Sequence, residues 1–443
     1  MDKHIVFDKA LTKADQVVLE SLARDIRHHR GKPATSNGKL DVDSGLGSES
    51  SGDEAACSLS QQDARQVLAL KALRDAKSAK FEPTIVLSVD DCSSLIPSAL
   101  DRYVLQPYIR HARKIVRHET DVVMVSHLLI YFTTLVPSAL FLFRHFTYVH
   151  AVCHFIMQMY YVGTYTLMQH QHIHQRGILS KKYGIFDAVF PYILDPLMGH
   201  TWNGYFYHHV KHHHVEGNGP DDLSSTIRYQ RDSVIDFLHY VGRFYFLIWL
   251  DLPLYFLRKN RPALALRAAA SEWATYTFYY CMTRLVGTKA TLFVYILPFL
   301  MLRIGLMVGN WGQHAFVDQD EPDSDFRSSI TVIDVASNRF CFNDGYHTSH
   351  HLNPLRHWRD HPISFLEQKH TYAREGALVF HNIDFLMITF RLMRKDYEHL
   401  AKCMVPVGED QMNLSMDERM RYLKRLTRRF SEAEIASKFR KAL

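Results

Sequence analysis

The 443-residue sequence lacks the features that mark several common classes of protein. Cysteine is scarce and no Cys-x-x-Cys pair occurs: the six cysteines stand at positions 57, 92, 153, 281, 341 and 403. This scatter argues against a disulfide framework and fits reduced, mostly buried thiols. The formal charge of +6 is mild and no helix-turn-helix, zinc-finger or RNP pattern is present, so no nucleic-acid partner is expected. The N-terminal stretch MDKHIVFDKALTKADQ has no apolar run, so no cleavable signal peptide is expected.

Two long apolar runs, residues 122–143 and 148–169, are each long enough to cross the ~30 Å hydrocarbon core of a bilayer. The residues RHFT separate them, which predicts a tight helical hairpin. Buried helices of a globular protein would give a similar pattern. Two such runs back to back, rich in Tyr and Phe, favour membrane spans.

Three later segments, 237–257, 271–286 and 290–309, compete for the membrane. If all the histidine clusters described below build one site, an even number of crossings must separate them, so one of the three does not cross. The loop after the first segment is basic, and short basic loops prefer the cytosolic side; it carries Arg258, Lys259, Arg261 and Arg267. We therefore expect 237–257 to lie in the interface and the other two segments to form a second hairpin. Glu272 and Arg284 are expected near the ends of their segment, where charge costs less.

The N-terminal region, 1–120, precedes these runs. Its first 30 residues are predicted to include an amphipathic helix. Residues 31–62 are rich in Gly, Ser and acids and are predicted to be disordered, because they cannot bury enough apolar surface to offset ordering entropy. Residues 63–80 are predicted to be helical, with Asp63 as the N-cap. Removal of residues 1–62 is therefore expected to leave the protein's activity largely intact.

The C-terminal tail, residues 386–443, is predicted to be helical and cytosolic. Ser415–Glu418 and Ser431–Glu434 have the spacing of capping boxes, and each precedes a basic amphipathic run. Such runs could attach to an anionic membrane face, but plain surface helices are the favoured interpretation.

Histidine is concentrated in residues 205–222, YFYHHVKHHHVEGNGPDD, which contain His208, His209, His212, His213 and His214. On a helix, residues three and four apart share a face, so His209, His212 and His213 are predicted to converge. Neutral imidazole is the commonest side-chain metal ligand and suits iron, zinc and copper. A register of His209, His213 and His214, or a role for His208, stays open because of the extra imidazoles. A solvated polar helix face is the alternative.

Three further clusters use similar spacing. MQHQHIHQRG carries His170 and His174, with His172 pointing elsewhere; GNWGQHAFVD carries Asn310 and His314; FNDGYHTSHHLNPLRHW carries His347, His350 and His351. Nine histidines and one asparagine are too many for a tetrahedral zinc ion, which takes three or four protein ligands. The clusters therefore predict two metal ions of higher coordination number, just outside the bilayer.

The segments HQHIH, HVKHH, NWGQH and HTSHH resemble the histidine boxes of the integral-membrane fatty-acid desaturase and hydroxylase superfamily, of the stearoyl-CoA desaturase type. The resemblance covers roughly residues 120–365. It implies a non-haem di-iron centre with all-imidazole ligation that activates O2 to attack an unactivated C–H bond of a lipid acyl chain. The residues that match the boxes are His170, His174, His209, His212, His213, Asn310, His314, His347, His350 and His351. The family pattern implies that Asn310 acts through water.

The expected architecture is an all-α membrane protein with about four transmembrane helices in two hairpins, under a cytosolic helical cap that holds the di-metal site. Residues 121–385 would form the catalytic domain. No His-Pro-Gly-Gly haem motif occurs, so electrons would come from a separate donor, such as cytochrome b5 or ferredoxin with its reductase. The active site is expected to face the cytosol, with the endoplasmic reticulum as the compartment.

Ligating histidines usually donate their second N–H to carboxylates or carbonyls. Five acidic residues near the boxes are candidates for this role: Glu216, Asp221, Asp222, Asp318 and Asp344. A desaturase is the favoured activity, with a hydroxylase, acetylenase or decarboxylase of the same superfamily as alternatives. A histidine-rich metal transporter or sensor is a remote alternative. The sequence leaves the substrate headgroup, the chain length and the position of oxidation open.

Overall fold

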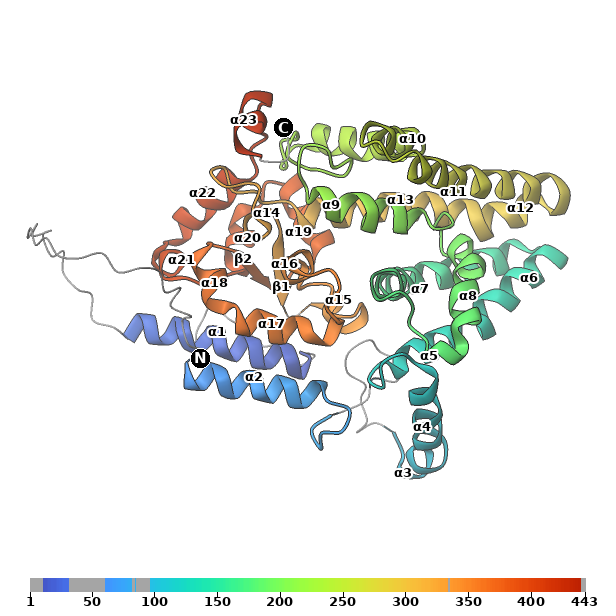
Figure 1. The fold of residues 1–443 in the computed structure, drawn as a ribbon, viewed down its shortest axis with the longest axis horizontal. Helices are drawn as coiled ribbons and strands as arrows, with labels where there is room; N and C mark the ends of the chain where they lie inside the picture. The colour runs from blue at the N-terminus through green and yellow to red at the C-terminus, as the bar shows by residue number, and fades with distance from the viewer. Residues whose placement is uncertain (1–10, 32–59, 82–83, 85–95, 334, 440–443) are drawn as a thin grey trace, which may run out of the picture.

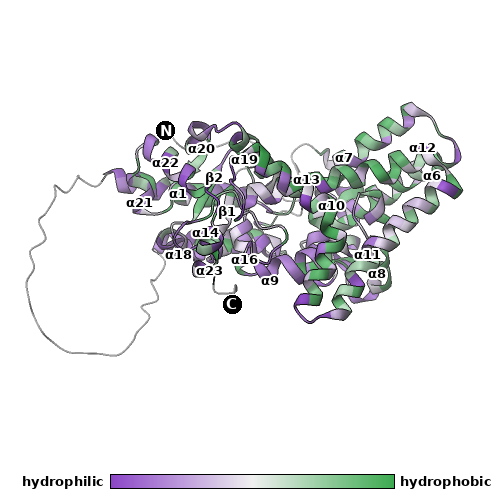
Figure 2. Cartoon of the chain, turned by 90° about the horizontal axis from the view of Figure 1, so that it is seen from above, coloured by the Kyte–Doolittle hydropathy of each residue, from purple (hydrophilic) through white to green (hydrophobic). Residues whose placement is uncertain are grey.

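The computed structural model describes residues 11–31, 60–81, 84, 96–333 and 335–439. These residues form a bundle of long helices that joins a cap of shorter helices around a small sheet (Figure 1). The bundle helices are largely hydrophobic along their length, whereas hydrophilic residues predominate on the outer helices of the cap (Figure 2). Most of the stretch predicted to be disordered, residues 31–62, lies outside the described residues.

The first hairpin of the bundle starts with a continuous helix over Val122–Arg144. It comprises α5 (Val122–Ile130), the π-helical turn η3 (Tyr131–Leu135) and α6 (Val136–Arg144). The returning helix is α7 (Tyr148–Gln175), and Thr147 caps it by accepting a hydrogen bond from the backbone N–H of His150. A hairpin at RHFT is therefore present, as the sequence predicted.

The second hairpin follows a helix that packs along it, α10 (Val234–Arg258). Its outgoing arm is α11 (Pro262–Cys281) with the π-helical turn η6 (Met282–Val286). The returning arm comprises α12 (Thr288–Thr291), the π-helical turn η7 (Leu292–Ile296) and α13 (Leu297–Gln313). The Lys289 ammonium lies 5.4 Å from the ring centroid of Tyr148, so the turns of the two hairpins lie at the same end of the bundle.

Two helices among the described residues are long and apolar enough to cross a membrane, Val122–Arg144 and Thr288–Gln313. They contain two of the predicted spans, 122–143 and 290–309. The other two predicted spans lie in α7 and in α11 with η6, which are long but carry buried polar residues such as Gln158 and Glu272. Membrane crossing by these two helices stays a prediction.

Glu272 lies well inside α11 and not near the end of a segment, because the helix begins at Pro262, earlier than predicted. Its carboxylate forms a buried ion pair with Arg303 of α13. The hydroxyls of Thr201 and Tyr276 donate to the same carboxylate, at 2.8 and 2.5 Å. A buried ion pair is tolerated when further hydrogen bonds satisfy its remaining groups, and this one links the two arms of the second hairpin.

Shorter helices surround the first hairpin and connect the two hairpins. They are α3 (Ser98–Leu100), η2 (Asp101–Leu105), α4 (Gln106–Ile115), η4 (Lys181–Tyr183), α8 (Gly184–Leu197), η5 (Phe206–His213) and α9 (His214–Glu216). The last two carry the second histidine box, and η5 is a π-helix.

The cap contains a three-stranded sheet, so the expectation of a purely helical fold was wrong in this part of the chain. β1 (Ile330–Ile333) pairs parallel with β2 (Leu378–His381), and β2 pairs antiparallel with β3 (Met404–Val405). Every strand residue is buried, so the alternation of apolar and polar residues that marks a half-exposed strand is missing. The sheet joins residues on both sides of the predicted boundary at residue 385, and the C-terminal tail shares the core of the cap.

The other cap elements are helices. They are α14 (Asp325–Ser328), α15 (Ala336–Phe340), α16 (His347–Leu352), η8 (Trp358–Asp360), α17 (His361–Glu367), α18 (Lys369–Arg374), α19 (Phe385–Met393), α20 (Tyr397–Cys403), α21 (Glu409–Asn413), α22 (Met416–Leu426) and α23 (Glu432–Lys438). α22 and α23 each begin with the predicted capping box, at Ser415 and Ser431.

The N-terminal helices α1 (Lys13–Gly31) and α2 (Gln61–Arg74) also belong to the cap. Ser60 and not Asp63 is the N-cap of α2: its hydroxyl accepts a hydrogen bond from the backbone N–H of Asp63 at 3.0 Å. Val18 and Leu19 are fully buried in the core that α1 shares with α17 and the sheet. Removal of residues 1–62 would expose this core, so the expectation of a tolerated truncation is not supported.

Candidate metal centre

Nine imidazoles converge in two groups where the bundle meets the cap. The first group contains His170, His174, His209, His214 and His350, and the second contains His213, His314, His347 and His351. Within each group, one nitrogen of every ring lies within 4.8 Å of the others. Imidazole nitrogens bind metal ions at about 2.0–2.1 Å, so ligands on opposite sides of one ion are about 4 Å apart. Each group therefore has the dimensions of a site for one ion.

Most ring pairs of the first group are T-shaped, with the two ring planes close to perpendicular. The Nε2 atoms of His170 and His209 are 2.8 Å apart, and those of His350 and His214 are also 2.8 Å apart. The Nε2 atom of His174 is buried and has no hydrogen-bond partner. A buried, unpaired ring nitrogen is costly unless an ion binds it, so the donor set of this group fits a metal.

The second group has the same character. The Nε2 atoms of His347 and His314 are 3.3 Å apart, and the Nε2 atom of His351 is buried without a partner. The outer nitrogens of two rings are occupied: Nδ1 of His314 donates to the backbone carbonyl of Ser328 at 2.7 Å, and Nδ1 of His213 donates to Asp222 at 2.7 Å. This fixes the tautomer that leaves the Nε2 lone pair free for an ion.

Burial favours the neutral form of several of these imidazoles. It lowers the pKa of His209, His214, His347 and His350 well below the usual histidine range, and the neighbouring imidazoles lower these pKa values further. Burial alone would raise the pKa of the Asp222 carboxyl, but its interactions with His213, His212 and His208 outweigh burial and hold that pKa well below its usual range. Asp222 therefore stays ionised beside the second group.

The second box uses a different register from the favoured one. The structure brings His209, His213 and His214 to the two groups and leaves His212 outside them. The reason is the π-helix η5, in which the backbone N–H of His214 donates to the carbonyl of His209, five residues earlier. A π-helix has more residues per turn than an α-helix, so i and i+5 share a face there. The alternative register that the sequence left open is the one this geometry favours.

His212 has other partners. Its Nε2 atom accepts a hydrogen bond from the backbone N–H of Leu223 at 3.1 Å, and its ring packs against Tyr255 at a centroid distance of 4.4 Å. His208 and His212 lie with Asp222 in a third, smaller group. Asp222 already accepts hydrogen bonds from His213 and from the backbone N–H of Asn218 and Ser224, so this group is part of the support of the second box.

Of the five acidic residues near the boxes, only Asp222 binds a histidine of the two groups directly. Glu216 accepts a hydrogen bond from the Tyr255 hydroxyl at 2.6 Å. Glu216 and Asp221 both form ion pairs with Lys259. Asp318 accepts from backbone N–H groups of its own loop. Asp325, which the sequence did not single out, lies 3.6 Å from Nδ1 of His351. It lies 26 residues before His351 in the chain, so no local spacing pointed to it.

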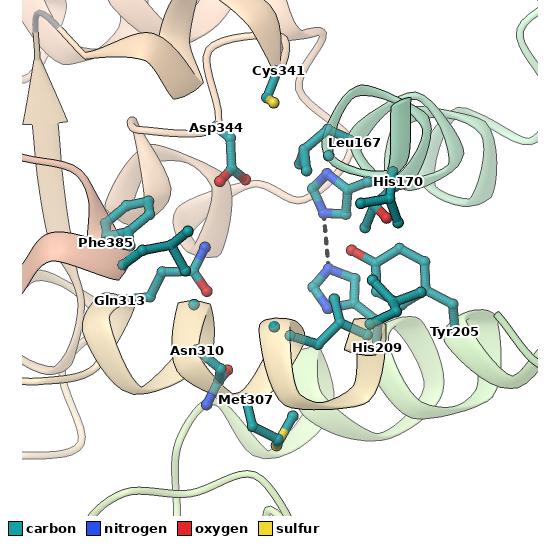
Figure 3. Close-up of a pocket in the computed structure, with 18 of the residues that line it drawn as sticks. Leu167, His170, Tyr205, His209, Met307, Asn310, Gln313, Cys341, Asp344 and Phe385 are labelled. Carbon is teal, nitrogen blue, oxygen red and sulfur yellow. Dashed lines mark hydrogen bonds between the residues drawn. The ribbon is translucent and has the colours of Figure 1, made fainter. Parts of the chain in front are cut away.

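A cavity of about 440 Å³ borders both groups. Figure 3 shows His170 and His209 of the first group in its lining. Its lining includes the predicted ligand Asn310, whose amide nitrogen donates to the Ser224 carbonyl and the Tyr240 hydroxyl at 2.8 and 2.7 Å. These bonds leave the Asn310 carbonyl oxygen as its remaining polar group. Asp344 points into the cavity opposite His170 (Figure 3), and burial raises the pKa of its carboxyl to about 7.

The walls of the cavity are mostly apolar. They include Leu167 of α7, Leu302, Leu306 and Met307 of α13, Phe244 of α10 and Phe385 of α19. Histidines of both imidazole groups line the same space, so a ligand there would have apolar contacts and lie beside the two groups. This arrangement fits a long, unfunctionalised chain.

The sequence model of the fatty acid desaturase family matches residues 126–382, more than half of the chain. No curated protein and no solved structure matches the chain. The matched region contains every box histidine, and the protein belongs to the fatty acid desaturase family. This confirms the resemblance drawn from the boxes. Membership implies an oxidoreductase that acts on lipid acyl chains with O2 and an electron donor, in a family that is generally di-iron and membrane-bound.

Proposed function

We propose that this protein is a membrane-bound, O2-dependent di-iron desaturase that introduces a double bond into the acyl chain of a lipid. The observation that carries the proposal is the pair of convergent imidazole groups beside one apolar cavity. His170, His174, His209, His214 and His350 would hold one iron, and His213, His314, His347 and His351 the other. Asn310 would complete the set through water.

The iron pair, when bound, supplies with O2 the oxidant that an unactivated C–H bond requires and that no side-chain base can replace. The residues of this chain hold and orient that centre. Asp222 and the Ser328 carbonyl fix the rings of His213 and His314 through their Nδ1 atoms. Such partners raise ligand basicity and typically change metal affinity or activity by about 10–100-fold when they are removed.

The cavity would position the acyl chain. Gly163 of α7 and Gly305 of α13 line it and are exposed, and so are Phe340 and Leu386, at 40% and 55%. These four residues mark where the cavity meets the surface. Gly305 belongs to a helix apolar enough to cross a membrane, so a chain could enter from the hydrocarbon phase. The absence of side chains at the two glycines leaves room for it.

The proposed setting is the endoplasmic reticulum, with the metal centre and cap in the cytosol. A cytosolic centre is accessible to a separate electron donor such as cytochrome b5 or ferredoxin with its reductase. Both ends of α10 support this arrangement, because they contact the cap and the second box. The Tyr397 hydroxyl of the cap donates to Asp232, just before α10, at 2.8 Å. The Tyr255 hydroxyl, near its other end, donates to Glu216.

The test is expression in a host that lacks the product, with gas chromatography and mass spectrometry of the total acyl chains. We expect new monounsaturated or polyunsaturated chains that require O2 and NADH. His350→Ala and His213→Ala should each lower product formation by at least about tenfold and should lose bound iron. Removal of a residue that only hydrogen-bonds to a ligand already costs about 10–100-fold. Hydroxylated or shortened chains would instead assign one of the related reactions. Metal uptake without acyl oxidation would assign a transporter or sensor.

A further inference from the structure

A second pocket, of about 660 Å³, lies on the other side of α7 from the metal centre. His172 lines it, two residues from His170 and His174, and therefore on the opposite face of the helix. Its Nε2 atom donates to the backbone carbonyl of Asp187 at 3.0 Å. The pocket thus belongs to the segment that links α7 with α8 and not to the proposed active site.

Three cationic side chains line this pocket, Arg117, Arg176 and Lys181. Two chain segments bring them together, because Val116 and Leu179 form an antiparallel bridge. One guanidinium nitrogen of Arg117 donates to the carbonyls of Gln175 and Arg176. Among the described residues, no carboxylate or other acceptor lies within hydrogen-bonding distance of the Arg176 or Lys181 side chain.

Among the described residues, Asp187 is the only carboxylate that lines this pocket. Its Oδ1 atom accepts from the backbone N–H groups of Ile178 and Leu179, at 3.2 and 3.3 Å. Gly177 is required beside it: its φ is +113°, and a Cβ atom there would lie 2.0 Å from Oδ2 of Asp187. Asp187 therefore stabilises the linking segment and does not pair with the cationic side chains. The pocket retains an excess of positive charge.

Beside the pocket, α8 exposes an apolar face. Its exposed residues are Ile185 (87%), Phe186 (43%), Val189 (46%), Tyr192 (50%) and Ile193 (41%). They recur at helical spacing, while Phe190 and Leu194 on the other face are fully buried. A helix of 14 residues is about 21 Å long, too short to cross a ~30 Å hydrocarbon core. The ring of Phe186 packs against Phe132 of the first apolar helix at 5.6 Å, so this face is continuous with it.

We propose that the pocket binds the headgroup of an anionic phospholipid, while the exposed face of α8 contacts the acyl region of the same leaflet. The proposal rests on the membrane setting of the family and not on the desaturation reaction. Basic residues next to an apolar surface are the combination that recognises anionic lipids, and each adds to the attraction at the membrane surface. A soluble phosphate would use the cationic groups but would leave the apolar face exposed to water.

The test uses the full chain, purified in detergent and mixed with equal amounts of phosphatidylglycerol and phosphatidylcholine. Native mass spectrometry then counts the bound lipids. We expect the natural protein to retain phosphatidylglycerol preferentially. The double variant Arg176→Gln/Lys181→Gln should lose about tenfold or more of this preference, since two attractive charges are removed. A matched control, Arg421→Gln/Lys424→Gln on exposed positions of α22, should retain it.

Two further arms separate the alternatives. Ile185→Ser/Val189→Ser keeps the charge and should weaken the binding of both lipids. Inorganic phosphate, added without lipid, should raise the melting temperature less than phosphatidylglycerol does. An equal effect of phosphate would assign the pocket to a soluble anion and overturn the proposal. An unchanged lipid preference in the double variant would also overturn it. In the absence of lipid, the iron content and the melting temperature of these variants should equal those of the natural protein. This result would distinguish the lipid site from the metal centre.

Discussion

The ammonium group of Lys259 lies 2.7 Å from the carboxylate of Asp221 and 3.2 Å from that of Glu216. Lys259 is in the turn between α10 and α11, and the two acids follow the second histidine box. The ion pairs therefore hold the start of the second hairpin beside the metal centre. The far turn of that hairpin lies near Tyr148, next to the turn of the first hairpin. This arrangement agrees with two hairpins whose open ends both lie beside the metal centre, on one side of the membrane.

The topology gives a first prediction. An Asn-x-Ser acceptor introduced near residue 262 should receive no glycan, because the turn after α10 faces the cytosol in the proposed orientation. The same acceptor should be modified when it is inserted in the turn after Arg144 or near Gly287, on a flexible linker long enough to reach the transferase. Mobility shift after expression in microsomes measures both. Modification near 262 alone would mean that α10 crosses the membrane.

The register of the second box gives a second prediction. His214→Ala should lower bound iron and product formation by at least about tenfold, because it removes a proposed ligand of the first group. His212→Ala should retain the iron and lose only stability, because it removes a hydrogen bond with Leu223 and the contact with Tyr255. Iron per protein, measured by elemental analysis, compares the two variants directly. The reverse result would restore the α-helical register.

The N-terminal helix gives a third prediction. The Tyr346 hydroxyl donates to the buried Asp15 at 2.6 Å, and Tyr346 directly precedes His347. Asp15→Ala should destabilise the cap by about 1–3 kcal/mol, because it leaves buried donors unpaired. Glu20→Ala, at an exposed position of the same helix, should have little effect. Melting temperature and iron content measure the difference, and equal values for the two variants would show that α1 does not support the centre.

The cavity gives a fourth prediction. A Cβ atom at Gly305 would meet no atom within 4 Å, so Gly305→Leu should fold normally while its side chain occupies the cavity. Displacement of the acyl chain should lower turnover by about ten- to a hundredfold, or shift the position of the double bond. Gly242→Leu is the matched control, since Gly242 is also unobstructed but lies on α10 away from the cavity. Unchanged products in the Gly305 variant would exclude this path.

The buried histidines give a fifth prediction, on pH. Burial lowers the pKa of His361 to about 3, compared with about 6.5 in an unfolded chain. Between these values the unfolded chain binds a proton that the folded chain does not. The contribution of His361 to the unfolding free energy should therefore be fully present above pH about 6.5 and fall by about 1.4 kcal/mol for each pH unit between about 6.5 and about 3. The box histidines with lowered pKa values act in the same direction.

The metal-free protein is the sample for this measurement, with melting temperatures at about pH 7.5 and pH 5 to cover the window given by the two pKa values. His361→Gln should show a smaller decrease than the natural protein, because it removes one of the groups that titrate. A melting temperature that does not fall between the two conditions would contradict the buried, neutral state of these rings.

Much of the site could be predicted from the sequence, because its information is local. Eight of the nine converging histidines were identified from spacings of three or four residues, which place side chains on one face of a helix. Two of the predicted spans and both capping boxes also depend only on local composition and spacing. Family membership followed from the same boxes.

Only the tertiary structure decided the rest. His214, and not His212, lies in the two imidazole groups because the segment is a π-helix, and an irregular turn of this kind leaves no periodic signal in composition. The sheet was missed because its strands are short and buried on both faces. Asp325 reaches His351, and Asp15 reaches Tyr346, from distant parts of the chain, and α1 proved to be part of the core of the cap. Contacts between residues far apart in sequence are set by packing, which local spacing does not encode.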